Sequence, residues 1–314
     1  MRWNDRIGRR LKLSDLHVLV AVAQNGSMIK AAGALSMSHP VVSRAISDLE
    51  HTLGVKLFDR NPRGVVLTPF GLAILNRSLA AFDELRSGVE DIAFLADPTA
   101  GEVRIGSTSA LARSFVTAVI DRLARRHPRI GFHVVAGEGR ALYRELEERN
   151  VDLLIARTFT ADHQDHIELE ALCDDPYVVA AGVRNPWARR RRVTLADIVG
   201  EPWVLPPLDS LVGSFVVEAF RASGLRLPHP TVLAFPAEVR TSLLETGRYL
   251  TILPRSMLRF PGRHPLIKEL PVKLPNTSGP VAIFTLKSRT LPPAAQLFID
   301  GAREVAKPLA NVKS

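Results

Sequence analysis

The sequence predicts a multidomain α and α/β protein with a small helical domain that ends in a two-stranded wing, a long linking helix and a two-lobed α/β region. Three observations support this prediction. Two short amphipathic patterns with a tight break between them fill residues 27–53, an apolar stripe runs from 69 to 96, and strands alternate with helical patterns beyond residue 101. With 314 residues, 46% of them hydrophobic, the chain can build two or three separate cores.

Three helices are expected in the N-terminal domain. The first runs from about Leu13 to Asn25 and ends at Gly26. The second follows Ser27, whose hydroxyl can accept hydrogen bonds from the free amides of the first turn. The third follows Ser38, a second good N-cap, and carries Pro40 in its first turn, where the missing N–H costs nothing.

The third helix has one apolar and one polar face. Apolar residues recur at spacings of four, three and four, which predicts a face that packs inward: Val42, Ile46, Leu49 and Leu53. The opposite face is small and polar with one forked cation: His39, Pro40, Ser43, Arg44 and Ser47. Such a face suits a major groove about 12 Å wide, where Arg44 can pair bidentately with a guanine edge. A solvated amphipathic helix is the alternative interpretation of these residues taken singly.

A wing is predicted after the third helix. Residues 55–59 form a short strand, 61–64 a turn and 65–68 the return strand. Arg60 and Arg63 lie on this wing, where they would meet backbone phosphates or the minor groove. Basic residues outnumber acidic residues ten to five through Val65, within a chain of net charge +9 and pI near 10.2. The excess of positive charge therefore gathers where DNA would bind.

The chain resembles the LysR-type transcriptional regulators in AAGALSMSHPVVSRAISDLEHTLGVKLFDR, residues 31–60, and in LTPFG, residues 67–71. The resemblance implies a sequence-specific DNA-binding regulator with a winged helix-turn-helix and a periplasmic-binding-protein-like effector domain. The family most often has Gln where this chain has His39, whose reach is shorter and whose charge depends on pH. The residues expected to bind DNA are Ser27, Lys30, Ser38, His39, Pro40, Ser43, Arg44, Ser47, Arg60 and Arg63.

A long helix is predicted from Pro69 to about Ala96. Its apolar residues recur at intervals of three and four: Leu72, Leu75, Leu79, Phe82, Leu85, Val89 and Ile92. At 1.5 Å per residue such a helix extends about 39 Å, too far for a small winged domain to bury alone. We therefore expect a homodimer, or the homotetramer that the resemblance implies. The third helices of two subunits would then lie about 34 Å apart on an inverted-repeat operator of double-stranded DNA.

Beyond Gly101 the order βαβαβ predicts a parallel sheet, with strands at 102–107, 131–137 and 152–157. Residues 169–172 lead into a second αβ unit, with strands at 176–181, 203–205, 231–235 and 249–253. The last strand, 281–287, and the last helix, 293–307, are expected to return to the first lobe. The predicted domains are 1–68, 69–97 and 101–314, in which lobe 1 covers 101–172 and 278–314 and lobe 2 covers 173–277.

Two lobes joined by two crossings make a cleft in which ligands bind beyond the carboxyl ends of strands. Ser107, Thr108 and Ser109 end one strand and open a helix, so they suit an anion, although one of them could simply cap that helix. Arg157 could fork onto a carboxylate or pair with a neighbouring Asp. We expect a small polar effector such as an organic acid, bound by Ser107, Thr108, Ser109, Arg157, Thr158, Pro206, Pro207 and Leu208.

The sequence lacks the motifs that other classes of function require. The sequence has no GxSxG elbow, no P-loop, no GxGxxG after a strand and no HExxH, so we expect no enzyme and no cofactor. An HxxH spacing flanked by carboxylates has no further ligand to complete a metal shell: Asp162, His163, Asp165 and His166. An architectural protein that bends DNA without an effector remains the alternative function, and it would bind arbitrary duplexes almost equally.

The sequence also bears on compartment and partners. Cys173 is the single cysteine and cannot form an internal disulfide, and the first residues lack the apolar core of a signal peptide. No window approaches the roughly 18 apolar residues that span a membrane. We therefore expect a cytoplasmic protein, with RNA polymerase as a further candidate partner. The cluster of Arg184 with Arg189 to Arg192 is interpreted as a solvated loop, with a second nucleic-acid contact as the alternative.

Overall fold

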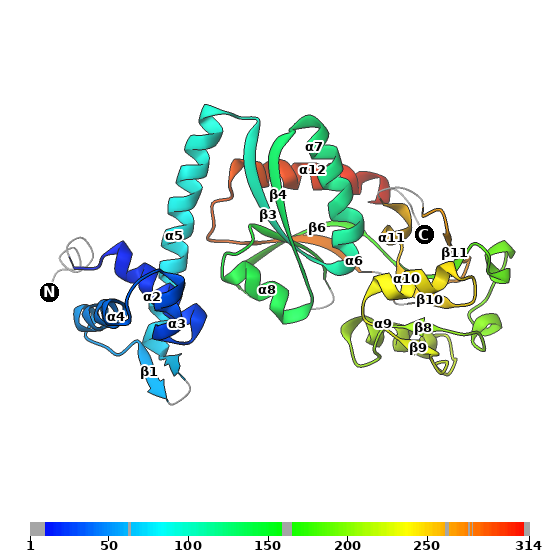
Figure 1. Cartoon of the computed structure of the whole chain (residues 1–314). Helices are drawn as coiled ribbons and strands as arrows, with labels where there is room; N and C mark the ends of the chain where they lie inside the picture. The colour runs from blue at the N-terminus through cyan, green and yellow to red at the C-terminus, as the bar shows by residue number, and fades with distance from the viewer. Residues whose placement is uncertain are drawn as a thin grey trace. The chain divides into compact units, whose positions relative to one another are not determined.

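The computed structural model describes residues 10–61, 64–158, 165–260, 264–275, 277 and 279–310. The chain divides into two compact units, 1–89 and 90–314, and the division falls within one long helix (Figure 1). Each unit has hydrophobic clusters of its own. The first unit is helical with a wing, and the second contains two α/β lobes.

The described part of the first unit contains three helices before the wing: α2 (Leu13–Asn25), α3 (Met28–Ala34) and α4 (His39–Leu53). Gly26 ends α2 with φ of 61°, a left-handed conformation that glycine adopts without steric cost. The hydroxyl of Ser27 accepts a hydrogen bond from Lys30 N at 3.5 Å, as expected of an N-cap. The apolar faces of the three helices meet in one core with these members: Leu16, Leu19, Val22, Ala31, Val42, Ile46 and Leu49.

The wing consists of β1 (Phe58–Asn61) and β2 (Gly64–Leu67), paired antiparallel. The prediction that a strand begins at residue 55 is wrong. The segment before Phe58 forms hydrogen bonds with a side chain of α4 and does not pair with β2. Glu50 Oε1 accepts hydrogen bonds from Leu57 N at 2.8 Å and Phe58 N at 3.4 Å, and Glu50 Oε2 pairs with Lys56 Nζ at 2.6 Å. This carboxylate therefore joins α4 to the wing.

The long helix α5 (Pro69–Ala96) has the bounds that the sequence predicts. Ile74 and Phe82 pack against the core of the first unit. Farther along the helix, the apolar stripe is uncovered in the single chain: Leu85, Val89 and Ile92 are 52%, 66% and 69% exposed.

Lobe 1 contains a five-stranded sheet in the order β4-β3-β5-β12-β6. The strands are β3 (Ala100–Thr108), β4 (Arg129–Gly137), β5 (Leu153–Arg157), β6 (Ile167–Asp174) and β12 (Pro280–Leu286). The parallel pairing predicted for the strands at 102–107, 131–137 and 152–157 is confirmed in β3, β4 and β5. β12 runs antiparallel to β5 and β6, because the chain returns from lobe 2 at the opposite end of the sheet.

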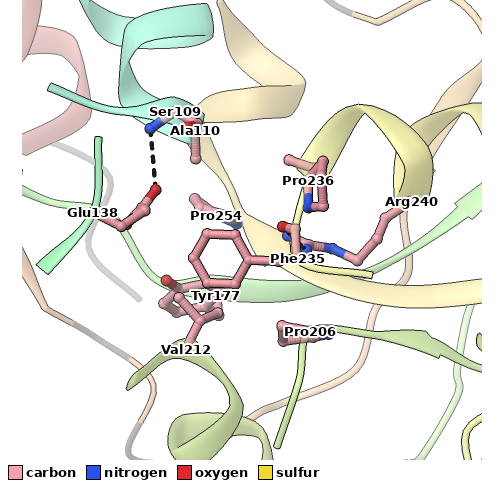
Figure 2. A pocket seen from close by; sticks show the side chains of 11 residues that line it. Ser109, Ala110, Glu138, Tyr177, Pro206, Val212, Phe235, Pro236, Arg240 and Pro254 are labelled. Carbon is pink, nitrogen blue, oxygen red and sulfur yellow. Dashed lines mark hydrogen bonds between the residues drawn. The ribbon is translucent and has the colours of Figure 1, made fainter. Parts of the chain in front are cut away.

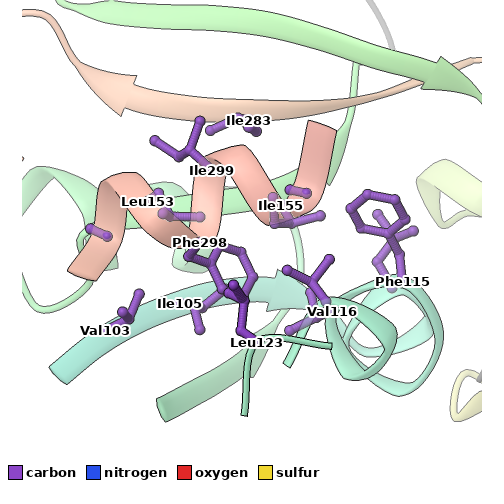
Figure 3. Close-up of a cluster of buried hydrophobic side chains, with 14 of the residues drawn as sticks. Val103, Ile105, Phe115, Val116, Leu123, Leu153, Ile155, Ile283, Phe298 and Ile299 are labelled. Carbon is purple, nitrogen blue, oxygen red and sulfur yellow. The ribbon is translucent and has the colours of Figure 1, made fainter. Parts of the chain in front are cut away.

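Helices cover this sheet: α6 (Ser109–Leu111), the π-helical turn η1 (Ala112–Val116), α7 (Thr117–Arg126), α8 (Gly139–Glu147) and α12 (Pro293–Ala310). Figure 3 shows Phe298 and Ile299 of α12 against Ile105 and Ile155 of the sheet. The last strand and the last helix therefore belong to lobe 1, as the sequence predicts.

Lobe 2 is built on β7 (Tyr177–Gly182), which lies between β10 (Leu250–Pro254) and β11 (Ile267–Glu269), both antiparallel to it. A parallel pair, β8 (Val204–Leu205) and β9 (Val232–Leu233), adjoins through a bridge from Trp203 to Leu250. The helical elements are η2 (Pro186–Arg189), η3 (Ala196–Ile198), α9 (Leu211–Ala222), α10 (Ala237–Glu245) and α11 (Ser256–Arg259). β11 and α11 were not predicted, since three or four residues show no period.

We predict that Glu50→Gln destabilises the first unit by about 1–2 kcal/mol at pH 7, because it weakens the hydrogen bonds from Leu57 N and Phe58 N. Burial raises the pKa of Glu50, but the hydrogen bonds from Lys56, Leu57 and Phe58 outweigh burial and lower this pKa overall. Stability from a lowered pKa is present above the unfolded value and is lost as pH falls through the folded value. Urea denaturation should therefore show a smaller difference from wild type at about pH 3.5. An equal difference at both pH values would show that the ionised Glu50 carboxylate does not stabilise the first unit.

Candidate DNA-binding surface and effector cleft

The outward face of α4 has the character that the sequence predicts. His39, Pro40, Arg44 and Ser47 are exposed, Ser43 is half-buried, and Val42, Ile46 and Leu49 face the core. Among the described residues no carboxylate pairs with Arg44, so its guanidinium is available to a ligand. The N-terminal half of α4 therefore presents an exposed polar face with one cation to the solvent.

The other residues expected to bind DNA surround this face. Ser27 caps α3, Lys30 is exposed on α3, and Ser38 is the exposed N-cap residue of α4, although its side chain makes no capping hydrogen bond. Arg60 lies in β1, but its side chain and the whole of Arg63 lie outside the described residues.

The second unit contains a hollow between its two lobes, with a volume of about 430 Å³ that includes solvent at its mouth (Figure 2). Lobe 1 contributes Ser109, Ala110 and Glu138, from the ends of β3 and β4. The wall from lobe 2 is mostly apolar with two polar groups: Tyr177, Pro206, Val212, Phe235, Pro236, Ala237, Arg240 and Pro254. A pocket with few polar groups among apolar walls is the usual form of a small-molecule site.

Glu138 is the acidic group of this cleft. Its Oε1 accepts a hydrogen bond from Ser109 N at 3.2 Å, which Figure 2 marks with a dashed line. Burial raises the pKa of Glu138, although the hydrogen bond from Ser109 and the charge of Arg240 oppose the rise. The amide that opens the helix after β3 is therefore already satisfied by a carboxylate of the protein itself.

Arg240 is the basic group of the cleft and is only 5% exposed. Its Nη1 donates to Ala234 O and Phe235 O, both at 2.7 Å, which fixes the guanidinium against the backbone before α10. Burial lowers the pKa of Arg240, and the neighbouring groups Tyr177, Glu238 and Glu138 act in the opposite direction. Its other terminal nitrogen, Nη2, makes no hydrogen bond within the described part of the chain.

The cleft brings together only part of the predicted effector set. Ser109 and Pro206 line it, whereas Thr108, Thr158, Pro207 and Leu208 do not. Ser107 is fully buried and donates its hydroxyl to Ile155 O at 2.9 Å.

Arg157 lies behind the cleft and forms a buried ion pair with Asp175, which was the alternative left open for it. Its guanidinium sits 4.5 Å from the ring centroid of Tyr177, a residue of the pocket wall. Arg157 therefore lies against a residue of the pocket wall without lining the pocket itself.

Sequence reasoning missed Glu138, Tyr177 and Arg240. The rule that strand ends gather at one edge could have identified Glu138, which follows β4, the neighbour of β3. Tyr177 begins β7 directly after the crossing between lobes and reads as a core residue. Arg240 lies inside a helix, and no local pattern distinguishes it from a solvated arginine.

The remaining candidate groups lie elsewhere. Cys173 is buried, and burial together with nearby acids raises the pKa of its thiol to about 12, so it is unreactive at neutral pH. Of the proposed metal cluster, Asp162 and His163 lie outside the described residues, and His166 Nε2 lies 3.3 Å from Glu147 Oε1. No group of three metal-binding side chains occurs in the part that the structure describes. Arg184 and the run from Arg189 to Arg192 are exposed.

The two units define a class of protein: a helix-turn-helix DNA-binding unit followed by a two-lobed ligand-binding unit. Comparison with known families agrees. Residues 13–72 match the bacterial regulatory helix-turn-helix protein of the lysR family, and residues 96–307 match the LysR substrate binding domain. The chain belongs to the LysR family of transcriptional regulators. It is a DNA-binding transcriptional regulator with an effector-binding domain.

Individual relatives give the same result. The chain is 30% identical over 302 residues to the HTH-type transcriptional regulator GbpR of Azospirillum brasilense, covering 94% of this chain and 86% of that one. It is 25% identical to PcaQ of Agrobacterium fabrum over 310 residues, or 96% of each chain. These relatives are regulators and not enzymes.

Solved structures share the fold. A variant of full-length OxyR from Pseudomonas aeruginosa matches with a TM-score of 0.70 and 22% identity, over 97% of this chain and 99% of that one. Full-length CbnR in complex with its target DNA matches with a TM-score of 0.55 and 21% identity, over 94% and 100%. None of the described helices combines the length and hydropathy needed to cross a bilayer.

We predict that Arg157→Ala lowers the free energy of unfolding of the second unit by about 3–5 kcal/mol, because it leaves Asp175 buried without its cation. Urea denaturation at pH 7 measures this loss. Arg125→Ala is the matched control, since Arg125 is exposed and pairs with Asp121 on the surface, and it should cost no more than about 1 kcal/mol. A loss for Arg157→Ala as small as that of the control would show that the buried pair does not stabilise the lobes.

Proposed function

We propose that α4 reads an inverted-repeat operator in the major groove and that a small polar ligand in the cleft controls how the protein holds that DNA. The observation that carries the DNA half is the exposed, polar N-terminal half of α4, with Arg44 unpaired among the described residues. The proposed contacts are Arg44 to base edges, Ser43 and Ser47 to bases or phosphates, and Lys30 to phosphates. His39 and Pro40 open the helix and would lie deepest in the groove.

The effector half of the proposal rests on the cleft between the lobes. A ligand that touches both Glu138 of lobe 1 and Arg240 of lobe 2 binds best when the lobes stand at one particular separation. It therefore favours one arrangement of the lobes over others and shifts the population toward it. The shift cannot exceed the difference in the affinity of the ligand for the two arrangements. We propose that the arrangement of the lobes is passed to DNA through α5.

The proposed assembly is a dimer through α5, or a tetramer built from two such dimers. The support is the uncovered stripe of Leu85, Val89 and Ile92, which a second copy of the same helix would bury. Such a dimer would present two reading helices to two half-sites. We further propose that the protein acts in the cytoplasm, where the DNA is, and that RNA polymerase is its partner at the promoter.

Arg44→Ala should weaken binding to the selected operator by about 1–3 kcal/mol and relax the preferred sequence, because a bidentate base contact is lost. Selection of sites from a random duplex pool, followed by titration of the best site, measures both effects. His51→Ala, exposed near the other end of α4, is the control and should change neither. An unchanged preferred sequence for Arg44→Ala would overturn the docking of α4. Equal binding of arbitrary duplexes by the wild type would favour an architectural protein.

Val89→Lys combined with Ile92→Lys should convert the oligomer to monomers at micromolar concentration, because charges would replace the apolar stripe. Sedimentation velocity measures the mass in solution. Glu84→Lys, also exposed on α5, changes the charge by the same amount outside the stripe and should leave the mass unchanged. A double variant that keeps the wild-type mass would exclude this stripe as the interface.

A further inference from the structure

The polar groups of the cleft have unused hydrogen-bonding capacity of both kinds. Glu138 uses Oε1 to accept from Ser109 N, while its Oε2 makes no hydrogen bond within the described residues. Arg240 uses Nη1 twice, and its Nη2 is without a partner in the same part of the chain. The hydroxyl of Tyr177 also makes no hydrogen bond to another described residue. The cleft thus offers an acceptor, a donor and a hydroxyl that can be either.

The charges that line the cleft balance. Glu138 and Arg240 are its ionisable lining groups besides Tyr177, and burial raises the pKa of Tyr177, which keeps the phenol neutral. Arg157, behind the wall, is neutralised by Asp175. Glu238, which is exposed and acts on Arg240, adds a negative charge and not a positive one. Among the described residues that line the cleft, no cation is left over to compensate a ligand that brings its own negative charge.

An anionic ligand therefore meets specific obstacles. The amide of Ser109, which would otherwise suit an anion, already holds Glu138. A carboxylate close enough to take Arg240 Nη2 would enter the field of Glu138, a half-buried like charge. A cationic ligand would likewise be repelled by the positive charge of Arg240. A ligand without net charge can use both groups with no such penalty.

The apolar lining supplies the rest of the recognition. Phe235 is 41% exposed and presents its ring to the hollow, with Val212 and Pro206 nearby in Figure 2. A flat apolar ring suits a ligand with one face of C–H groups. A sugar or cyclic polyol has such a face and also carries hydroxyls that donate and accept around its edge.

We propose that the effector is an electroneutral polyhydroxylated molecule, of the class of a sugar or cyclic polyol. It donates a hydroxyl to Glu138 Oε2, accepts from Arg240 Nη2 and lays a C–H face on Phe235. This inference rests on the proposed function, because it names the class of ligand that the cleft takes. It differs from the organic acid expected from the sequence, because Glu138 occupies the Ser109 amide and Arg157 makes the pairing with an Asp that was its open alternative.

The test is calorimetric titration of the full chain with two sets of probes at equal concentrations. One set contains neutral hexoses, pentoses and inositols, and the other contains benzoate, succinate and other mono- and dicarboxylates. We expect binding by at least one neutral probe and by no carboxylate. Phe235→Ala should weaken that binding, which locates the probe in the cleft.

Glu138→Gln separates charge from shape. It should weaken the neutral probe about tenfold, because a charge-assisted hydrogen bond becomes a neutral one. The same change leaves Arg240 as the charged group of the lining, so carboxylates should now bind more tightly than to wild type. Glu168→Gln, exposed on β6, is the control and should change neither affinity.

The outcomes separate the inference from the proposed function. Carboxylate binding to wild type that Phe235→Ala weakens would overturn the neutral ligand but keep the effector cleft. No binding by either set, with operator affinity unchanged by every probe, would overturn the inference and count against effector control through this cleft. A neutral probe that binds equally well to wild type and Glu138→Gln would also overturn it.

Discussion

The second unit depends on one buried ion pair at the crossing between its lobes. Asp175 lies between the last strand of lobe 1 before the crossing and the first strand of lobe 2. One of its oxygens pairs with Arg157 at the end of β5, and the other accepts from Ser256 N in lobe 2 at 2.8 Å. A buried charge is costly unless it is paired and hydrogen-bonded, so these three groups hold each other in place. The pair thereby fixes where lobe 2 begins relative to the sheet of lobe 1.

The shape of the cleft depends on that ion pair. Arg157 stacks on Tyr177, and Tyr177 is part of the pocket wall. Two further contacts join the lobes near the same place: Arg113 Nη1 donates to Thr241 Oγ1 at 3.1 Å, and the hydroxyls of Ser114 and Ser256 lie 3.3 Å apart. Motion about this pinned region would change the distance between Glu138 and Arg240 most directly. A ligand that bridges those two groups can therefore act on the arrangement of the lobes.

The structure of the first unit can be predicted from the sequence better than the structure of the cleft, because the interactions that form the first unit are more local. Caps, breaks and stripes are local, so Ser27, Gly26 and the bounds of α5 follow from neighbouring residues. The start of the wing does not follow from neighbouring residues, because it depends on the hydrogen bond from Leu57 N to the Glu50 side chain of α4. In the cleft, whether Arg157 faces a ligand or Asp175 depends on how two strands and a crossing meet. Arg240 comes to line the same cleft as Glu138 only when lobe 2 has folded.

The distance between two spin labels on opposite lobes tests whether Asp175 fixes the arrangement of the lobes. Labels can be attached at Ala141→Cys and Arg226→Cys, which are exposed, while the buried Cys173 stays unlabelled. We expect a narrow distribution of distances for this pair and a clearly broader one when Asp175→Asn is added. Circular dichroism checks that both proteins remain folded. The same narrow distribution in both would contradict the claim that the ion pair holds the lobes.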